Sequence, residues 1–263
     1  MTRCEDGNGT TKCGDHEICA DCVLYNLLGQ HAEDAFARQL LARLTHSKSA
    51  LKTGEVLKRE EEPFKGLFML TTGALKTYTI SEDGNEQIIS FHLPGELIGL
   101  SAMGRGYHVG CTVAISPSNL CAMPAQDLEK LCAREPKLQR RLFGLATQEL
   151  SRRERLHQLM SGSRAEGRLA MALLNIACRL QSHDGSSLHR FRLPMARADL
   201  AAYLGLTPET TSRHLRSWES KGMIATRGRE FEIRKPNELE RMAGQEHVDG
   251  QDQDKNRFNL RVV

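Results

Sequence analysis

Three closely spaced cysteines near the start of the chain are the first residues that could carry chemistry. Cys13, Cys19 and Cys22 lie in a polar, glycine-containing segment, residues 1–22, which also holds Cys4. A segment of this composition buries too little apolar surface to fold by itself, so a bound group would have to order it. Thiolates bind soft metals and iron–sulfur clusters, and three of them leave a four-coordinate site one ligand short. We therefore expect a bound metal or cluster with a further ligand.

The residue types leave two alternatives to an iron–sulfur cluster. Cys13, Cys19 and Cys22 together with His16 would also make a local zinc site. Reversible thiol oxidation without any metal is the other alternative. Four further cysteines lie beyond residue 22. Three of them stand among apolar residues and are predicted to be small buried core residues, namely Cys111, Cys132 and Cys178. The fourth is Cys121.

A second group of chemically informative residues stands on the stretch 197–215. Apolar spacing predicts a short helix from Asp199 to Leu204, and Gly205 can turn the chain sharply after it. Thr207 is a typical helix N-cap, and the proline that follows it suits the first helical position. A second helix is therefore expected from Pro208 to about Lys221.

The second helix carries polar side chains that suit base reading and phosphate contact: Thr207, Glu209, Thr210, Ser212, Arg213 and Arg216. Two helices joined by a tight turn make a helix-turn-helix, whose second helix enters the major groove of DNA. Arg213 matches the O6 and N7 acceptors of guanine, Glu209 can accept from a cytosine amino group, and Arg216 suits a phosphate. A helical hairpin in an unrelated core would not need these residues together.

Charge distribution is more informative than net charge, which is +3. Residues 188–235 hold ten Lys and Arg against five Asp and Glu, while residues 1–47 hold four against seven. A local basic excess around the helix-turn-helix is what phosphate neutralisation requires. No long apolar run or signal segment is evident, so we expect a cytoplasmic protein without a membrane partner. Its eight cysteines then favour metal or redox chemistry over disulfides.

The elements ahead of this helix-turn-helix have the texture of a small β-domain. Between Leu51 and Pro124 short β-prone runs alternate with glycine-containing turns, and Asp83-Gly84 is a strong hairpin signal. Roughly eight strands are expected, closing as a small barrel or roll. After the helix-turn-helix, residues 223–233 predict a β-hairpin that would form a wing.

Long helices are expected to connect the two parts. Pro136 begins a helix that runs to about Met160, and its leucines are predicted to line a dimer coiled coil: Leu138, Leu142, Leu145, Leu156 and Leu159. A single long core helix is the alternative. The predicted domains are a cysteine-rich segment (1–22), a sensory β-roll domain opened by a short amphipathic helix pair (23–135), a dimerisation helix (136–162), a winged helix-turn-helix domain (163–244) and a disordered tail (245–263).

These motifs resemble those of the CRP/FNR family of bacterial regulators. Residues 198–215 resemble the helix-turn-helix signature of that family, and residues 54–99 resemble the β-roll of its FNR-type members. The strongest matches in the β-roll are Gly73-Ala74-Leu75-Lys76, Asp83-Gly84-Asn85-Glu86-Gln87 and Phe91-His92-Leu93-Pro94-Gly95. The resemblance implies an α+β fold: an N-terminal cyclic-nucleotide-binding-like β-roll, a long dimerisation helix and a C-terminal winged helix-turn-helix.

The resemblance to FNR-type members also implies a sensory mechanism. In those proteins several N-terminal cysteines and one from the β-roll hold an oxygen-labile [4Fe–4S] cluster, and by resemblance the distant ligand here is Cys121. Cys19 and Cys22 match the first pair of the family spacing, but the usual third cysteine is Leu28 in this chain. Cys13 is the favoured replacement because its loop to Cys19 is short, and Cys4 is the alternative.

The family mechanism implies the partners. An intact cluster favours the homodimer, which binds TTGAT-type half-sites in an inverted repeat of double-stranded DNA, and oxygen releases the DNA. RNA polymerase is the further partner of such an activator or repressor. Relatives that bind cyclic nucleotides carry an Arg-Ser pair downstream of Gly95-Glu96, and this chain lacks it, so no cyclic nucleotide is expected. A haem-binding relative is a further alternative. No nucleophile with an adjacent base and no cofactor-binding glycine loop is evident, so we expect no enzyme.

Overall fold

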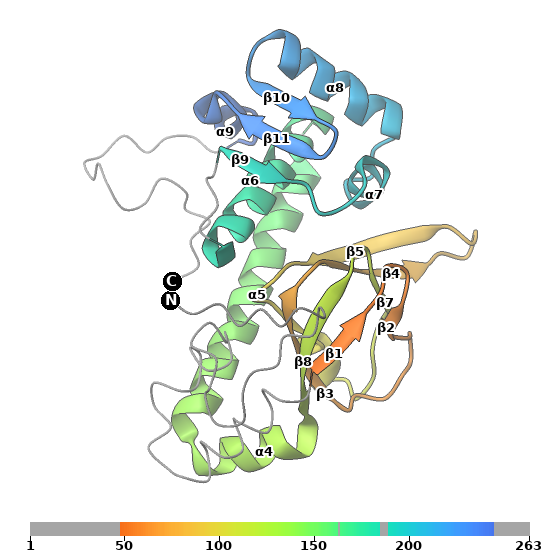
Figure 1. Ribbon diagram of the computed structural model, residues 1–263, viewed down its shortest axis with the longest axis vertical. Coiled ribbons are helices and arrows are strands. Elements are labelled where there is room, and N and C mark those ends of the chain that lie inside the picture. The colour runs from red at the N-terminus through yellow and green to blue at the C-terminus, as the bar shows by residue number, and fades with distance from the viewer. Residues whose placement is uncertain (1–47, 163, 185–188, 245–263) are drawn as a thin grey trace, which may run out of the picture.

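The computed structural model describes residues 48–162, 164–184 and 189–244. The predicted cysteine-rich segment, the amphipathic pair expected at residues 23–44 and the tail from residue 245 lie outside these ranges. Figure 1 shows a β-roll, a long helix running along it, and a helical C-terminal domain with a small sheet at the far end of that helix. The class is α+β, as the sequence predicts.

Two antiparallel four-stranded sheets face each other in the β-roll, in the orders β1-β8-β3-β6 and β2-β7-β4-β5. Their strands are β1 (Lys48–Leu51), β2 (Val56–Lys58), β3 (Gly66–Thr72), β4 (Leu75–Ile80), β5 (Glu86–His92), β6 (Leu97–Ile98), β7 (Cys111–Ala114) and β8 (Ser118–Pro124). A short helix, α3 (Leu100–Met103), follows β6. The β4–β5 hairpin turns at Asp83-Gly84, as expected, with Gly84 at φ 77°.

The interior of the β-roll is apolar where the two sheets meet. Leu70 and Leu120 from one sheet pack with Leu75 and Ala114 from the other. Each leucine is completely buried, which stabilises the fold by about 1.5–3 kcal/mol per side chain. Gly66 lets β3 approach β8, because a Cβ at this position would lie 2.1 Å from the carbonyl oxygen of Met123.

Two helices follow the last strand and cover the outer face of the β1-β8-β3-β6 sheet. The helix α4 (Ala125–Arg134) buries Leu128 and Leu131 against this face, and α5 (Pro136–Gly162) adds Leu142. Pro136 starts α5 at the position where the missing N–H is tolerated. The long helix then leads away from the sheet toward the C-terminal domain (Figure 1).

The leucines predicted to form the dimer seam do not all face outward. Leu142 is 9% exposed and packs with Leu145 against the β-roll of the same chain. The structure gives no side-chain description for the other three, Leu138, Leu156 and Leu159. The large apolar side chains exposed on the described part of α5 are Phe143 and Leu150, which are 64% and 57% exposed. These two lie on an adjacent stripe, seven residues apart.

The C-terminal domain combines four helices with a three-stranded sheet of order β10-β11-β9. Its elements are α6 (Ala165–Asp184), β9 (Arg190–Arg192), α7 (Arg197–Tyr203), α8 (Pro208–Ser220), β10 (Ile224–Arg227), β11 (Glu230–Ile233) and α9 (Pro236–Met242). Trp218 is fully buried and donates its Nε1–H to Glu166 Oε1 at 2.7 Å.

The β-roll and the C-terminal domain share one apolar cluster. Ile88, Phe91 and Leu93 of the β-roll belong to the same buried cluster as Leu200 of α7, with Tyr203 packed against it. The Phe91 and Tyr203 rings meet edge to face at 5.2 Å between centroids. None of the described helices has the length and apolar character needed to cross a membrane.

Candidate functional site

The two helices α7 and α8 form the predicted helix-turn-helix. The turn between them places Gly205 at φ 61°, a left-handed conformation that favours glycine. Thr207 caps α8 as expected, because its side-chain oxygen accepts the backbone N–H of Thr210 at 3.1 Å. Pro208 takes the first helical position. Local sequence signals therefore fix where the second helix begins.

The second helix, α8, separates buried apolar residues from exposed polar ones. Thr211, Leu215 and Trp218 are buried. The predicted base-reading residues lie on the opposite side: Thr207, Glu209, Arg213 and Arg216 are exposed, and Thr210 and Ser212 are half-buried. Glu209, Arg213 and Arg216 follow one another at helical spacing of four and three residues, so one helix face presents an acceptor and two guanidinium groups. This arrangement can hydrogen-bond base edges and phosphates.

An arginine that the sequence analysis did not single out ties the wing to the helix-turn-helix. Arg197, at the start of α7, donates to Thr226 Oγ1 at 3.0 Å and to the Gly228 carbonyl at 3.2 Å. Thr226 in turn donates its backbone N–H to Glu219 of α8 at 3.1 Å. The β10–β11 turn is therefore fixed to both helices. No local pattern predicts this contact, since Arg197 is 29 and 31 positions away from Thr226 and Gly228.

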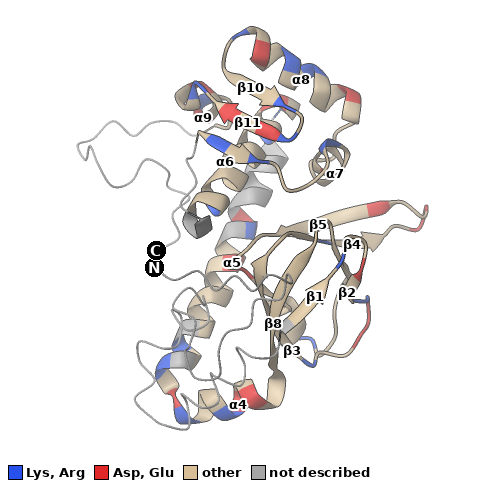
Figure 2. Ribbon diagram, in the orientation of Figure 1, with Lys and Arg blue, Asp and Glu red and all other residues tan. Residues whose placement is uncertain are grey.

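Positive charge in this domain is partly paired on the small sheet. Figure 2 shows Lys and Arg on α8 and β9, and Glu on the adjacent β11. Arg190 lies 3.0 Å from Glu232, and Arg192 lies 3.8 Å from Glu230. The Arg190 hydrogen bond holds the pKa of Glu232 below its ordinary value. The arginines of α8 are therefore the stronger candidates for contact with a polyanion.

The cysteine predicted to be the distant cluster ligand, Cys121, lies in the middle of β8 and is 4% exposed. It packs with Met69 and Leu128 on the sheet face covered by α4 and α5. Across the antiparallel ladder its partner is Lys48, which is the first residue that the structure describes. The chain that carries the N-terminal cysteines therefore joins the β-roll directly beside Cys121.

This placement fits an iron–sulfur ligand. A thiol on a rigid strand among apolar side chains supplies the soft donor that such a cluster takes, shielded from water. Cys22 lies 26 positions before Lys48, so the intervening chain is long enough to bring the N-terminal thiols to this face. Cys13, Cys19, Cys22, Cys4 and His16 lie outside the described residues. Within the described ranges no three His, Cys, Asp or Glu side chains are grouped to hold a metal ion.

The other three described cysteines are less buried than predicted. Cys111, Cys132 and Cys178 are all half-buried. Cys132 packs at the edge of the cluster that contains Cys121, and burial raises the pKa of its thiol. A raised pKa keeps this thiol protonated at neutral pH when no metal is bound.

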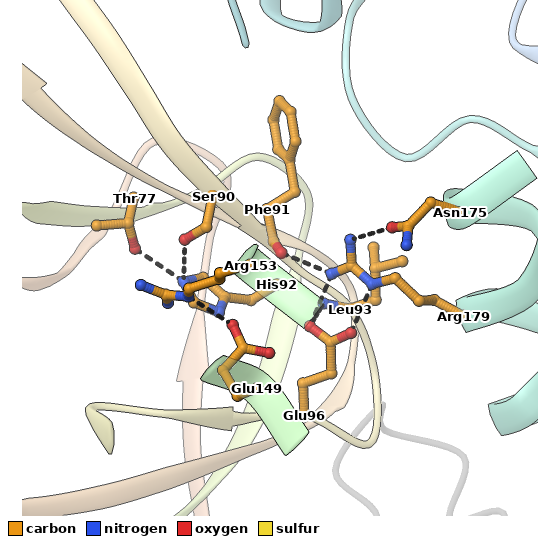
Figure 3. A network of polar contacts seen from close by, with 10 residues as sticks. All are labelled: Thr77, Ser90, Phe91, His92, Leu93, Glu96, Glu149, Arg153, Asn175 and Arg179. Carbon is orange, nitrogen blue, oxygen red and sulfur yellow. Dashed lines mark hydrogen bonds and ion pairs between the residues drawn. The ribbon is translucent and has the colours of Figure 1, made fainter. Parts of the chain in front are cut away.

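Inside the β-roll a row of polar side chains crosses the β7-β4-β5 sheet. Thr77 Oγ1 lies 2.8 Å from His92 Nε2 and 2.9 Å from Thr112 Oγ1, and Ser90 Oγ lies 3.2 Å from the same imidazole nitrogen. Figure 3 shows Thr77, Ser90 and His92 of this row beside the Glu149–Arg153 ion pair of α5. Burial lowers the pKa of His92 to about 4, so its imidazole is neutral at pH 7.

Comparison with known proteins matches each half of this architecture to a protein family. Residues 167–242 match the family described as the Crp-like helix-turn-helix domain, and residues 48–135 match the family described as the cyclic nucleotide-binding domain. The fumarate and nitrate reduction regulatory protein of Escherichia coli strain K12 is 33% identical over 244 residues, covering 93% of this chain and 95% of that protein.

A relative with the same name from Shigella dysenteriae is 34% identical over 244 residues, with the same coverage of both chains. Among solved structures, that of FixK2 from Bradyrhizobium japonicum is similar, with a TM-score of 0.68 and 30% identity. It covers 74% of this chain and 96% of the FixK2 chain. The similarity therefore extends over the β-roll, the long helix and the helix-turn-helix together.

Proposed function

This chain belongs to the CRP/FNR family of transcription regulators, and we propose that it is an oxygen-responsive member whose dimer is controlled by a [4Fe–4S] cluster. It is a DNA-binding regulator and not an enzyme. The observation that carries the proposal is the position of Cys121, at the point where the cysteine-bearing segment joins the β-roll. The proposal keeps the domain limits predicted from the sequence. It also places the regulator in the cytoplasm.

DNA reading is assigned to the exposed face of α8. Arg213 is proposed to contact guanine O6 and N7, because its planar fork matches that pair of acceptors. Glu209 is proposed to accept from cytosine, and Arg216 to hold a phosphate, with Thr207, Thr210 and Ser212 completing the contacts. The family resemblance supports TTGAT-type half-sites in an inverted repeat.

Dimerisation is assigned to α5. Membership of the CRP/FNR family supports a homodimer, and the described part of this helix exposes Phe143 and Leu150. We propose that these two side chains form the seam, whereas Leu142 and Leu145 anchor the helix to its own β-roll. Burying two large exposed side chains on each of two chains favours association by several kcal/mol.

Sedimentation of the protein purified without air tests this assignment. Phe143→Ala combined with Leu150→Ala is expected to shift the dimer toward monomer, while Lys137→Ala, at an exposed position of the same helix away from that stripe, serves as a control. A monomeric wild-type protein, at concentrations that saturate its DNA, would refute the dimer.

The cluster ligands are proposed to be Cys13, Cys19, Cys22 and Cys121. When bound, a [4Fe–4S] cluster supplies an oxygen-labile cross-link between the N-terminal segment and the β-roll. Cys121 would be the fixed end of this link, since β8 is held by β1 and β3 on either side. Through α4 and Leu142 of α5, the face that contains Cys121 is in contact with the start of the dimer helix.

The experiment is iron and sulfide analysis, with visible absorption, of protein purified without air. Each of the eight cysteines is replaced by serine in turn. Loss of iron confined to the four proposed ligands supports the assignment. Full iron content in Cys13→Ser, with loss in Cys4→Ser, would move the ligand to Cys4. A colourless zinc protein, a haem spectrum or a metal-free thiol sensor would reject the cluster.

Two further proposals concern a cyclic nucleotide and RNA polymerase. The carboxylate of Glu96 in the Gly95-Glu96 pair is engaged by Arg179 of α6, which supports signalling without a cyclic nucleotide. Contact with RNA polymerase is proposed from the family resemblance. Binding of cyclic AMP by calorimetry would reject the first of these proposals.

A further inference from the structure

An arginine of α6 connects the C-terminal domain to the β-roll. Arg179 Nε lies 2.7 Å from Glu96 Oε1, its Nη2 donates to Glu96 Oε2 at 2.8 Å, and the same Nη2 donates to the Phe91 carbonyl at 2.6 Å (Figure 3). Burial by itself lowers the pKa of Arg179, but the Glu96 carboxylate outweighs this effect and raises the pKa above its ordinary value. The pair is therefore ionised, bidentate and largely removed from water.

The turn that carries Glu96 makes this carboxylate a rigid partner. Pro94 and Gly95 occupy the centre of a tight turn, with Gly95 at φ 85°, and the Glu96 backbone N–H donates to the Leu93 carbonyl at 3.2 Å. In addition, Glu96 Oε2 accepts the Leu93 backbone N–H at 3.1 Å. This is the pattern of a type II turn, which needs glycine at its third position. The carboxylate is thus held by its own loop before α6 reaches it.

A second ion pair joins the β-roll to the helix-turn-helix itself. Lys76 Nζ of β4 lies 3.2 Å from Asp199 Oδ1 of α7 and 2.7 Å from Glu86 Oε2 of β5. Its side chain is 13% exposed. Between the two ion pairs, the Phe91 and Tyr203 rings pack edge to face. The outer face of the β4–β5 hairpin therefore holds α6 and α7 at three separate points.

These contacts leave the polar face of α8, here called the reading helix, exposed to solvent. In Figure 1, α7 lies over β5, whereas α8 lies beyond α7 on the side away from the β-roll. Glu209, Arg213 and Arg216 are exposed in this arrangement. The contacts therefore orient α8 without covering the side chains that would touch DNA.

We propose that the Arg179–Glu96 and Lys76–Asp199 pairs are positioning contacts that set the angle of each reading helix relative to α5, and thereby the half-site spacing that the dimer accepts. The inference rests on the dimer and inverted repeat of the proposed function. Apolar packing alone tolerates small rotations, while a bidentate ion pair has a fixed geometry. Both pairs are partly buried, so desolvation offsets much of their attraction, and their defined geometry is the property that this proposal uses.

The physical consequence concerns the second half-site. Once one reading helix is bound, the second helix has an effective concentration at its own half-site. That concentration depends on how freely the second helix moves. A domain held at a fixed angle has a high effective concentration at one spacing and a low one at all others. A domain released from the β-roll spreads over many spacings, so its best affinity falls and its spacing preference flattens.

The test uses the full-length protein purified without air and a set of DNA duplexes. The set contains an inverted repeat at the preferred spacing, the same repeat with one or two base pairs inserted or removed, and a duplex with a single half-site. Glu96→Gln and the milder Asp199→Asn are compared with wild type. Asp127→Asn is the control, because it makes the same change in an ion pair between Asp127 and Lys130 of one helix.

The expected result is a loss of about fivefold or more at the preferred spacing, a flatter spacing profile and unchanged affinity for the single half-site. Arg179→Lys, which keeps the charge but not the fork, should fall between wild type and Glu96→Gln. An unchanged spacing profile in both variants would overturn the inference, as would an equal loss on every duplex, since that indicates damage to the fold. A wild type that is indifferent to spacing would instead reject the inverted-repeat dimer.

Discussion

On α8, Glu209, Arg213 and Arg216 point to solvent, whereas inside the β-roll Thr77 and His92 contact each other and their polar neighbours. The two regions place their polar side chains differently. Groups on the helix are available to an external partner. The side chains of this row in the β-roll are hydrogen-bonded to one another, and losing one leaves buried polar atoms without a partner. Substitutions in the first region should therefore change DNA binding, and substitutions in the second should change the free energy of unfolding.

The largest effect is expected on the reading helix. Arg213→Ala should weaken binding to the matching inverted repeat by about 1–3 kcal/mol for each half-site, because a bidentate contact to guanine is lost. Binding to a random duplex should change much less. Competition titrations with both duplexes measure the difference.

Arg216→Ala is the matched comparison, since it removes the same side chain three residues further along α8. It should weaken binding to both duplexes alike and reduce the salt dependence by about one phosphate contact. Equal losses on every sequence for Arg213→Ala would assign that arginine to phosphate and break the proposed division of labour on the helix.

The pH dependence of unfolding probes the interior group. His92 has an ordinary pKa of 6.5 when unfolded and about 4 when folded, because burial disfavours the charged ring. As pH falls from about 6.5 to about 4, the unfolded chain binds the proton first, so stability is lost across that window. The full shift corresponds to about 3 kcal/mol.

Urea unfolding at pH 7 and pH 4.5 checks this sign. Wild type should lose more stability between the two conditions than His92→Gln does. His189→Gln, which removes an imidazole from an exposed position, is the comparison variant. Identical slopes for wild type and His92→Gln would mean that His92 is not the group that couples protonation to unfolding.

A smaller effect is expected for one hydroxyl of the same row. Thr77→Val keeps the shape but removes the hydrogen bonds to His92 and Thr112, which should lower the free energy of unfolding by about 1–3 kcal/mol. Thr79→Val, two positions along β4, should change it by less than about 0.5 kcal/mol. Neither change should alter the ratio of specific to random DNA binding, and a changed ratio would contradict the separation of the two regions.

The smallest effect belongs to a residue that is both structural and placed for DNA contact. Thr207→Ala removes the cap of α8 and should lower the free energy of unfolding by about 1 kcal/mol. Thr207→Ser keeps the hydroxyl and should remain close to wild type. If Ala and Ser are equally stable in thermal unfolding, the hydroxyl does not cap the helix in solution.

The sequence predicted the long or strongly signalled elements of both regions, but it did not predict the shortest ones. The helix-turn-helix followed from local signals, since one helix of fixed period determines which residues share its exposed face. The β4–β5 hairpin and most strands of the β-roll also followed from turn residues and alternation. The short elements α3, β9 and α9 were not expected, because four, three and seven residues carry too little periodicity to detect.

The long helix shows where a periodic signal becomes ambiguous. Its 27 residues contain two apolar stripes, one with Leu142 and Leu145 and another with Phe143 and Leu150. The leucine periodicity predicts only the first stripe, and it cannot say whether that stripe faces the β-roll or a second chain. That choice depends on how α4 and the start of α5 pack on the sheet.

By itself, the sequence determined the helices, strands and turns whose causes lie within a few residues. The Thr207 cap, the Asp83-Gly84 hairpin and the exposed polar face of α8 belong to this class. Each depends on backbone conformation or helical period, which neighbouring residues decide.

Only the tertiary structure decided which distant residues meet. Glu96 and Arg179 are 83 positions apart, and Lys76 and Asp199 are 123 apart, yet each pair is in contact. The position of Cys121 beside Lys48 likewise depends on the β1–β8 register. Such contacts depend on how whole sheets and helices pack, because no local conformational preference acts over these separations. The orientation of the reading helix is therefore a property of the packed molecule.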